Sequence, residues 1–307
     1  MTDTSPQPIY LADYTPPGWL IEDVHLTFRL APGATRVLSR IRFVPNPAAP
    51  GGQSFFLHGE GLTLISSAID GAPVQPTLDT GGLTCPVPDR AFTWEAEVEI
   101  NPAANTALEG LYMSNGMYCS QCEAEGFRHI TYYPDRPDVM APFRVRIEGD
   151  APVLLSNGNK AAEGPGWAEW DDPWPKPAYL FALVAGDLVA RSDSFTTMRG
   201  RDVALKLWTR PGPDADKTEW AMQALKAAMA WDEQSYGREY DLDIFQIVAV
   251  SDFNMGAMEN KGLNIFNTSA VLASADTSTD ANFARIEGII AHEYFHNWTG
   301  NRITCRD

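Results

Sequence analysis

The sequence predicts a multidomain chain in which an N-terminal all-β sandwich, residues 1–190, precedes an α+β region, residues 191–307. Two observations carry this prediction. From about residue 20 to 190, apolar and polar residues alternate with period two, as in VHLTFRL at 24–30, which is typical of half-buried strands. After residue 190, strands mix with longer segments of helical spacing, and such a change of texture indicates a second domain.

The elements follow one another in a clear order. Turn-forming clusters such as PNPAAPGG at 45–52 and LSNGN at 155–159 separate the strands of the first region. The second region is predicted to contain, in order, a strand at 202–208, a helix at 216–235, an apolar strand at 243–250, an extended glycine-containing segment at 253–262 that is followed by LNIFN, and a helix at about 282–298. Thr279 or Asp280 offers an N-cap to that last helix.

Composition limits the possible functions. The chain has 307 residues, of which 44% are hydrophobic and 11% aromatic, as expected for ordinary globular cores. Its 23 basic and 40 acidic residues give a net charge of -17, which disfavours binding to nucleic acid or to an anionic membrane. The N-terminus lacks a signal-peptide pattern, and the four cysteines suit a reducing compartment. We therefore expect a soluble cytoplasmic protein, whose oligomeric state the sequence does not indicate.

The motif HEYFH near the end of the chain predicts a metal site. On a helix, His292 and His296 lie four positions apart and therefore on one face, where their imidazoles can share one metal ion. Glu293 is one step round the helix, where its carboxylate can take a proton from water beside the metal. The sequence therefore predicts one zinc ion held by His292 and His296, with Glu293 as the catalytic general base.

A third zinc ligand is harder to find. The metzincin pattern would place glycine and histidine at positions that Thr299 and Arg302 occupy here, so that class is excluded. Cys305 and Asp307 are the other strong ligand types after His296, and neither lies at a spacing that favours it. The remaining alternative is a glutamate beyond residue 307.

The segment GAMEN at 256–260 is the second candidate for a functional role. Small residues leave one edge of this extended segment accessible, so a substrate backbone could pair there as an added strand. If Glu259 binds the free ammonium group of a peptide, only the first peptide bond can reach the metal. The alternative for Glu259 is an edge-strand charge that prevents aggregation.

Family resemblance favours the first interpretation. GAMEN followed by HEYFH resembles the M1 family of zinc aminopeptidases. Three longer strings resemble the bacterial branch of that family: DLDIFQIVAVSDFNMGAMENKGLNIFN at 241–267, QCEAEGFRHITYYPDRPDV at 121–139 and YLFALVAGDL at 179–188. The resemblance implies that the β-domain is saddle-like and that residues 191–307 form the first part of a thermolysin-like catalytic domain. The implied activity is removal of N-terminal residues from peptides with a free N-terminus.

The resemblance also assigns residues in this sequence. It implies that His292 and His296 are zinc ligands, that Glu293 is the general base and that Glu259 binds the substrate amine. It further implies substrate-binding roles for a second set near the same pocket: Glu123, Gln121, Met255, Gly256 and Ala257. Cys119 and Cys122 form a CxxC without a second pair, so we expect them to be reduced cysteines near the pocket.

The family's third ligand would fall at position 315, past residue 307. We therefore expect residues 1–307 alone to hold zinc weakly and to have little peptidase activity. Two alternatives stay open: a non-catalytic fragment or binding module, and a relative with epoxide hydrolase activity.

Overall fold

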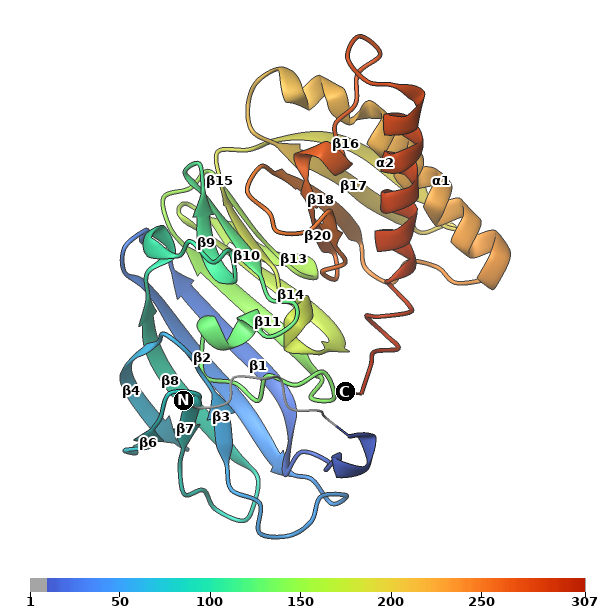
Figure 1. Cartoon of the computed structure of the whole chain (residues 1–307). Helices are drawn as coiled ribbons and strands as arrows, with labels where there is room; N and C mark the ends of the chain where they lie inside the picture. Colours follow the sequence, from blue (N-terminus) through green and yellow to red (C-terminus); the bar gives the residue numbers. More distant parts are fainter. Residues whose placement is uncertain (1–9, 307) are drawn as a thin grey trace, which may run out of the picture.

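The structure, a computed structural model, describes residues 10–306. An eight-stranded sheet forms the body of the N-terminal region (Figure 1). All its neighbouring strands are antiparallel except β1 and β11, which run parallel. In spatial order the strands are β13 (Asn159–Gly164), β14 (Trp167–Lys176), β11 (Ala141–Glu148), β1 (Trp19–Arg29), β2 (Thr35–Pro45), β8 (Phe92–Ile100), β4 (Thr63–Ile69) and β5 (Ala72–Pro73).

Two smaller antiparallel sheets complete this region. A four-stranded sheet has the order β12 (Val153–Ser156), β15 (Leu183–Gly186), β10 (Met117–Gln121) and β9 (Gly110–Ser114). A three-stranded sheet has the order β3 (Phe56–His58), β7 (Gly82–Thr84) and β6 (Thr77–Leu78). Alternate residues of β1 and β2 are buried, as period two requires. The predicted β-rich N-terminal region is confirmed.

A five-stranded mixed sheet and two helices form the C-terminal region (Figure 1). The sheet order is β16 (Val189–Thr196), β17 (Asp202–Thr209), β18 (Ile244–Val250), β20 (Leu263–Asn267) and β19 (Ala257–Met258). The helices α1 (Glu219–Tyr236) and α2 (Asp280–Phe295) pack against each other beside this sheet. The strand β16, which pairs with β17, was not predicted from the sequence, because its polar and half-exposed residues show little apolar alternation. The domain boundary near residue 190 stays a prediction.

Six short 3-10 helices connect these elements. They are η1 (Leu11–Asp13), η2 (Pro102–Ala104), η3 (Gly126–His129), η4 (Ala178–Leu180), η5 (Pro213–Thr218) and η6 (Thr268–Ala270). Within residues 10–306, no helix is both long and apolar enough to cross a membrane.

One apolar core runs through the three N-terminal sheets and continues into the five-stranded sheet. Val248 of β18, Met258 of β19 and Ile265 of β20 belong to the same buried cluster as Phe28 and Trp94. A second cluster lies between the five-stranded sheet and the helices, where Ile286, Ile290 and Tyr294 form the buried stripe of α2. The shared core holds β19 in a fixed place relative to the N-terminal region.

The helix α2 begins at Asp280, two residues before the predicted start at about 282, and it ends earlier than predicted. Thr279 caps it in a capping box, since the Asn282 backbone N–H donates to Thr279 Oγ1 and the Thr279 N–H donates to Asn282 Oδ1. The helix ends at Phe295 rather than at 298. Asn297 Nδ2 donates to the Tyr294 carbonyl at 2.7 Å, and a side chain that takes a backbone acceptor in this way competes with helix continuation.

Candidate active site

Two imidazoles face each other at the end of α2, where His292 lies on the last turn and His296 directly follows Phe295. The Nε2 atoms of His292 and His296 are 3.1 Å apart. Zinc–nitrogen bonds of about 2.0–2.1 Å in tetrahedral geometry would separate the two nitrogens by about 3.3 Å. The Nδ1 of His296 lies 2.6 Å from the Thr299 carbonyl oxygen, so that nitrogen carries the proton and Nε2 keeps its lone pair. The pair therefore fits a shared metal ion.

No third ligand joins this pair in the part of the chain that the structure describes. Among residues 10–306, no group of three or more histidine, cysteine, aspartate or glutamate side chains has a metal-binding arrangement. Cys305 is exposed and free, and Asp307 lies outside the described residues. The donor set among residues 10–306 is therefore the two imidazoles of His292 and His296.

Glu293 lies next to His292 in the chain and is 6% exposed. Burial raises the pKa of its carboxyl to about 8, and the nearby carboxylates of Glu259 and Glu123 add to the increase. A cation held by the two imidazoles would counteract both effects and lower this pKa. A carboxyl poised in this way can accept and return a proton near neutral pH.

Glu259 and Glu123 come from distant parts of the chain. Glu259 directly follows the edge strand β19, and Glu123 lies two residues after the end of β10 in the four-stranded sheet. Burial raises the pKa of Glu123, the neighbouring Glu259 raises it further, and His296 lowers it. The three carboxylates therefore lie within electrostatic reach of one another, and Glu123 lies within reach of the His296 imidazole.

The other predicted substrate-binding residues lie at the same place. Gln121, the last residue of β10, donates from Nε2 to Met255 Sδ at 2.8 Å. Met255 is exposed and Gly256 borders open space, since a Cβ built on Gly256 would meet no atom within 4 Å. Ala257 begins β19, which pairs on one side with β20 and forms the edge of the sheet. Among the described residues no strand pairs with the other edge of β19, although the side chains of Ala257 and Met258 are buried.

Sequence reasoning missed two residues that contact this region. Asp252 accepts a hydrogen bond from Ser114 Oγ at 2.7 Å, and this bond fastens the segment before Met255 to β9. Tyr179 donates to the Gly300 carbonyl at 3.4 Å, and Glu259 and Glu123 are among the groups that raise its pKa, after burial. Asp252 and its partner lie 138 positions apart, so no local sequence pattern could reveal the contact.

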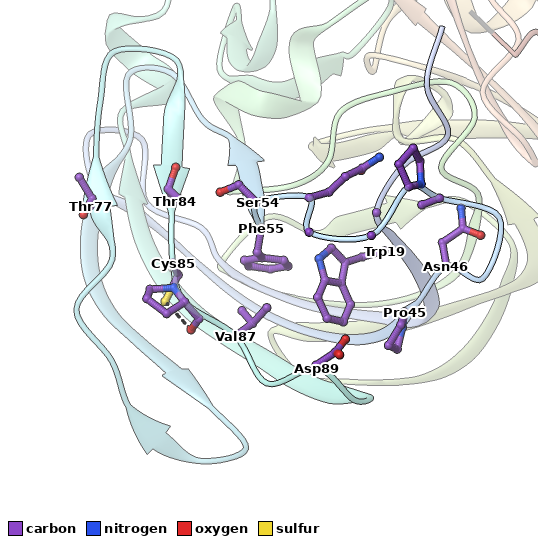
Figure 2. Close-up of a pocket in the computed structure, with 17 residues that line it drawn as sticks. Trp19, Pro45, Asn46, Ser54, Phe55, Thr77, Thr84, Cys85, Val87 and Asp89 are labelled. Atoms are coloured by element: carbon purple, nitrogen blue, oxygen red, sulfur yellow. Dashed lines mark hydrogen bonds between the residues drawn. The ribbon is translucent and has the colours of Figure 1, made fainter.

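A large cavity elsewhere lacks comparable chemistry. It measures about 580 Å³ and opens in the N-terminal region, where Trp19, Phe55 and Val87 form its apolar wall (Figure 2). Asp89 is the one charged residue among its described lining residues, and no histidine lines it. The cluster of carboxylates and imidazoles is therefore a better candidate for the active site than this cavity.

Comparison with known proteins identifies the family of the chain. Residues 74–180 match the Peptidase M1 N-terminal domain and residues 220–307 match the Peptidase family M1 domain. The chain is 55% identical to the aminopeptidase N of Caulobacter vibrioides over 100% of its own length and 36% of that protein. It is 52% identical to the aminopeptidase N of Escherichia coli over 98% of its length and 35% of that protein.

A solved structure is similar over nearly the whole chain. The crystal structure of Legionella pneumophila aminopeptidase A in complex with aspartic acid superposes with a TM-score of 0.91 at 34% identity, covering 97% of this chain and 36% of that one. The chain therefore spans about a third of the length of these relatives. The two M1 matches together cover more than half of its residues, and the chain belongs to the M1 peptidase family.

Proposed function

We propose that the protein containing this chain is a zinc aminopeptidase, which hydrolyses the first peptide bond of peptides with a free N-terminus. One observation carries the proposal: carboxylates from two separate segments lie close to Glu293 and to the imidazole of His296, at the edge of a sheet. A peptide that pairs with this edge would present its ammonium group to Glu259 and Glu123. That contact fixes the register of the chain, so that the first peptide bond lies beside Glu293.

His292 and His296 would hold the zinc ion, because their Nε2 spacing and the tautomer of His296 suit it. When bound, zinc supplies a Lewis acid that polarises the peptide carbonyl and makes water more acidic. Glu293 takes the proton of the attacking water and returns it to the leaving amine. Gln121 and Met255 line the place of the first side chain, and Gly256 and Ala257 contact the substrate backbone.

The test uses the product of the complete reading frame, because the relatives are about three times as long as this chain. We expect cleavage of L-alanine 4-nitroanilide and none of its N-acetylated form. Glu293→Gln should lower kcat by roughly 10²- to 10⁴-fold, the usual contribution of a general base. Cleavage of the acetylated substrate at a similar rate would contradict the assignment of Glu259 and Glu123 as amine-binding residues.

The proposal includes a cytoplasmic location. All four cysteines, Cys85, Cys119, Cys122 and Cys305, are free, and the first three are buried, which suits a reducing compartment. Immunodetection of the protein in fractionated cells tests this, and recovery outside the cytoplasmic fraction would contradict it.

A further inference from the structure

The turn that follows α2 is attached to His296 by two hydrogen bonds. The Asn301 backbone N–H donates to the His296 carbonyl at 2.9 Å, and the Thr299 carbonyl faces His296 Nδ1. Gly300, between them, has φ +132, and a Cβ there would lie 2.8 Å from His296 Nδ1. A glycine is therefore needed at this position, and the place of the turn is tied to the place of the imidazole.

The side chain of Asn301 reaches the other half of the site. Asn301 is 2% exposed, and its Nδ2 donates to the backbone carbonyl of Glu259 at 3.1 Å. The ladder between β19 and β20 ends at Met258, so the Glu259 carbonyl lies beyond the last paired residue. Because that partner is an acceptor, the amide must present its NH₂ group to Glu259.

A second contact joins the same two segments. Lys261 Nζ lies 3.4 Å from Asn297 Oδ1, and both residues are buried. This longer contact therefore also links the two segments, because Lys261 lies two positions after Glu259 and Asn297 lies one position after His296. Asn301 is bonded more directly, because its backbone holds the histidine segment and its side chain holds the glutamate segment.

We propose that Asn301 is a positioning residue that sets the separation between the amine-binding carboxylate Glu259 and the imidazole of His296. The inference rests on the proposed function and adds to it the residue that determines the register of the bound peptide relative to the metal ligands. The Asn301 bond fixes the carbonyl plane of Glu259 and hence the direction of its side chain. Without the bond, the carboxylate shifts relative to the ammonium group of the bound peptide, while the metal ligands remain in place.

The test compares binding of trialanine and N-acetyl-trialanine by NMR titration, which needs neither metal nor turnover. The unchanged chain should bind trialanine more tightly, because only that peptide carries the ammonium group. Asn301→Ala should remove most of this preference, by roughly tenfold, while affinity for the acetylated peptide stays the same. Asn301→Asp, which keeps the size and loses the donor, should have the same effect.

Asn157→Ala is the matched control. Asn157 is also buried, and its Nδ2 donates to the backbone carbonyls of Lys261 and Leu180, so the variant loses the same kind of bond without touching Glu259. We expect it to lose stability and to keep the preference for trialanine. An equal loss of preference in Asn157→Ala, or a preference retained in both Asn301 variants, would overturn the inference. Absence of any preference in the unchanged chain would instead refute the proposed amine site itself.

Discussion

Gly256→Val should separate substrate binding from stability. Gly256 is exposed, its φ lies outside the left-handed region, and a Cβ there would meet no atom within 4 Å. Valine favours extended backbone, and a residue other than glycine restricts the unfolded chain. We therefore expect the free energy of unfolding to change by no more than about 0.5 kcal/mol, the usual range for exposed positions.

The same side chain should interfere with a bound peptide. The open space beside Gly256 is the place where the substrate backbone is expected, and filling such space costs about 1–3 kcal/mol. That cost corresponds to a decrease of kcat/KM by about 5- to 160-fold. The assays are urea unfolding of residues 1–307 and hydrolysis of L-alanine 4-nitroanilide by the product of the complete reading frame.

Gly300→Ala provides the opposite case. Its Cβ would clash with His296 Nδ1 and its φ of +132 disfavours any side chain, so we expect a loss of more than about 1 kcal/mol of unfolding free energy.

If Gly256→Val keeps kcat/KM within about twofold of the unchanged protein while the fold is intact, the substrate does not approach this edge, and the proposed pairing with β19 is wrong.

Three further predictions concern stability, positioning and metal content. Asp232 is 2% exposed, its Oδ2 has no hydrogen-bond partner, and burial raises the pKa of its carboxyl to about 6. The folded state therefore keeps the proton of this carboxyl to higher pH than the unfolded state does. As a result, the free energy of unfolding falls as the pH rises from about 4 to 6. Asp232→Asn should consequently gain about 2 kcal/mol more, relative to the unchanged chain, at pH 7 than at pH 4 in urea unfolding, and equal gains would contradict this. Asp252→Ala removes the hydrogen bond to Ser114. Hydrogen exchange around Met255 should therefore become faster, and KM should rise by about tenfold with little change in kcat. Unchanged hydrogen exchange would show that Asp252 does not anchor this segment. After dialysis, residues 1–307 should retain well under one zinc per chain, whereas near-stoichiometric zinc would indicate a third ligand such as Cys305.

Local patterns in the sequence were sufficient for much of the fold and for the two motifs. The spacing of His292 and His296 on an amphipathic helix predicts their common face, and the structure places their Nε2 atoms together. The end of α2 was predicted three residues too late, because the side chain of Asn297 bonds to the Tyr294 carbonyl. Apolar periodicity contains no information about such a bond.

Contacts between distant segments could not be predicted from these patterns. Asn301 and Glu259 lie 42 positions apart, and Asp252 and Ser114 lie 138 apart. In each pair, one side chain holds a backbone or carboxylate group whose position depends on the packed sheets. The substrate-binding role of Glu123 was predicted only from the resemblance to the family, because its residue type and neighbours alone suggest an ordinary surface charge.

The apolar core shared by the N-terminal sheets and β18, β19 and β20 has a consequence for dissecting the molecule. Val248, Met258 and Ile265 are buried against the N-terminal region, so expressing residues 1–190 alone would leave apolar side chains in water that the intact chain covers. A graft that exchanges the N-terminal region between two relatives would have to exchange these three side chains as well. The natural unit for engineering this chain is therefore the N-terminal sheets together with the five-stranded sheet, since a cut near residue 190 would divide a single hydrophobic core.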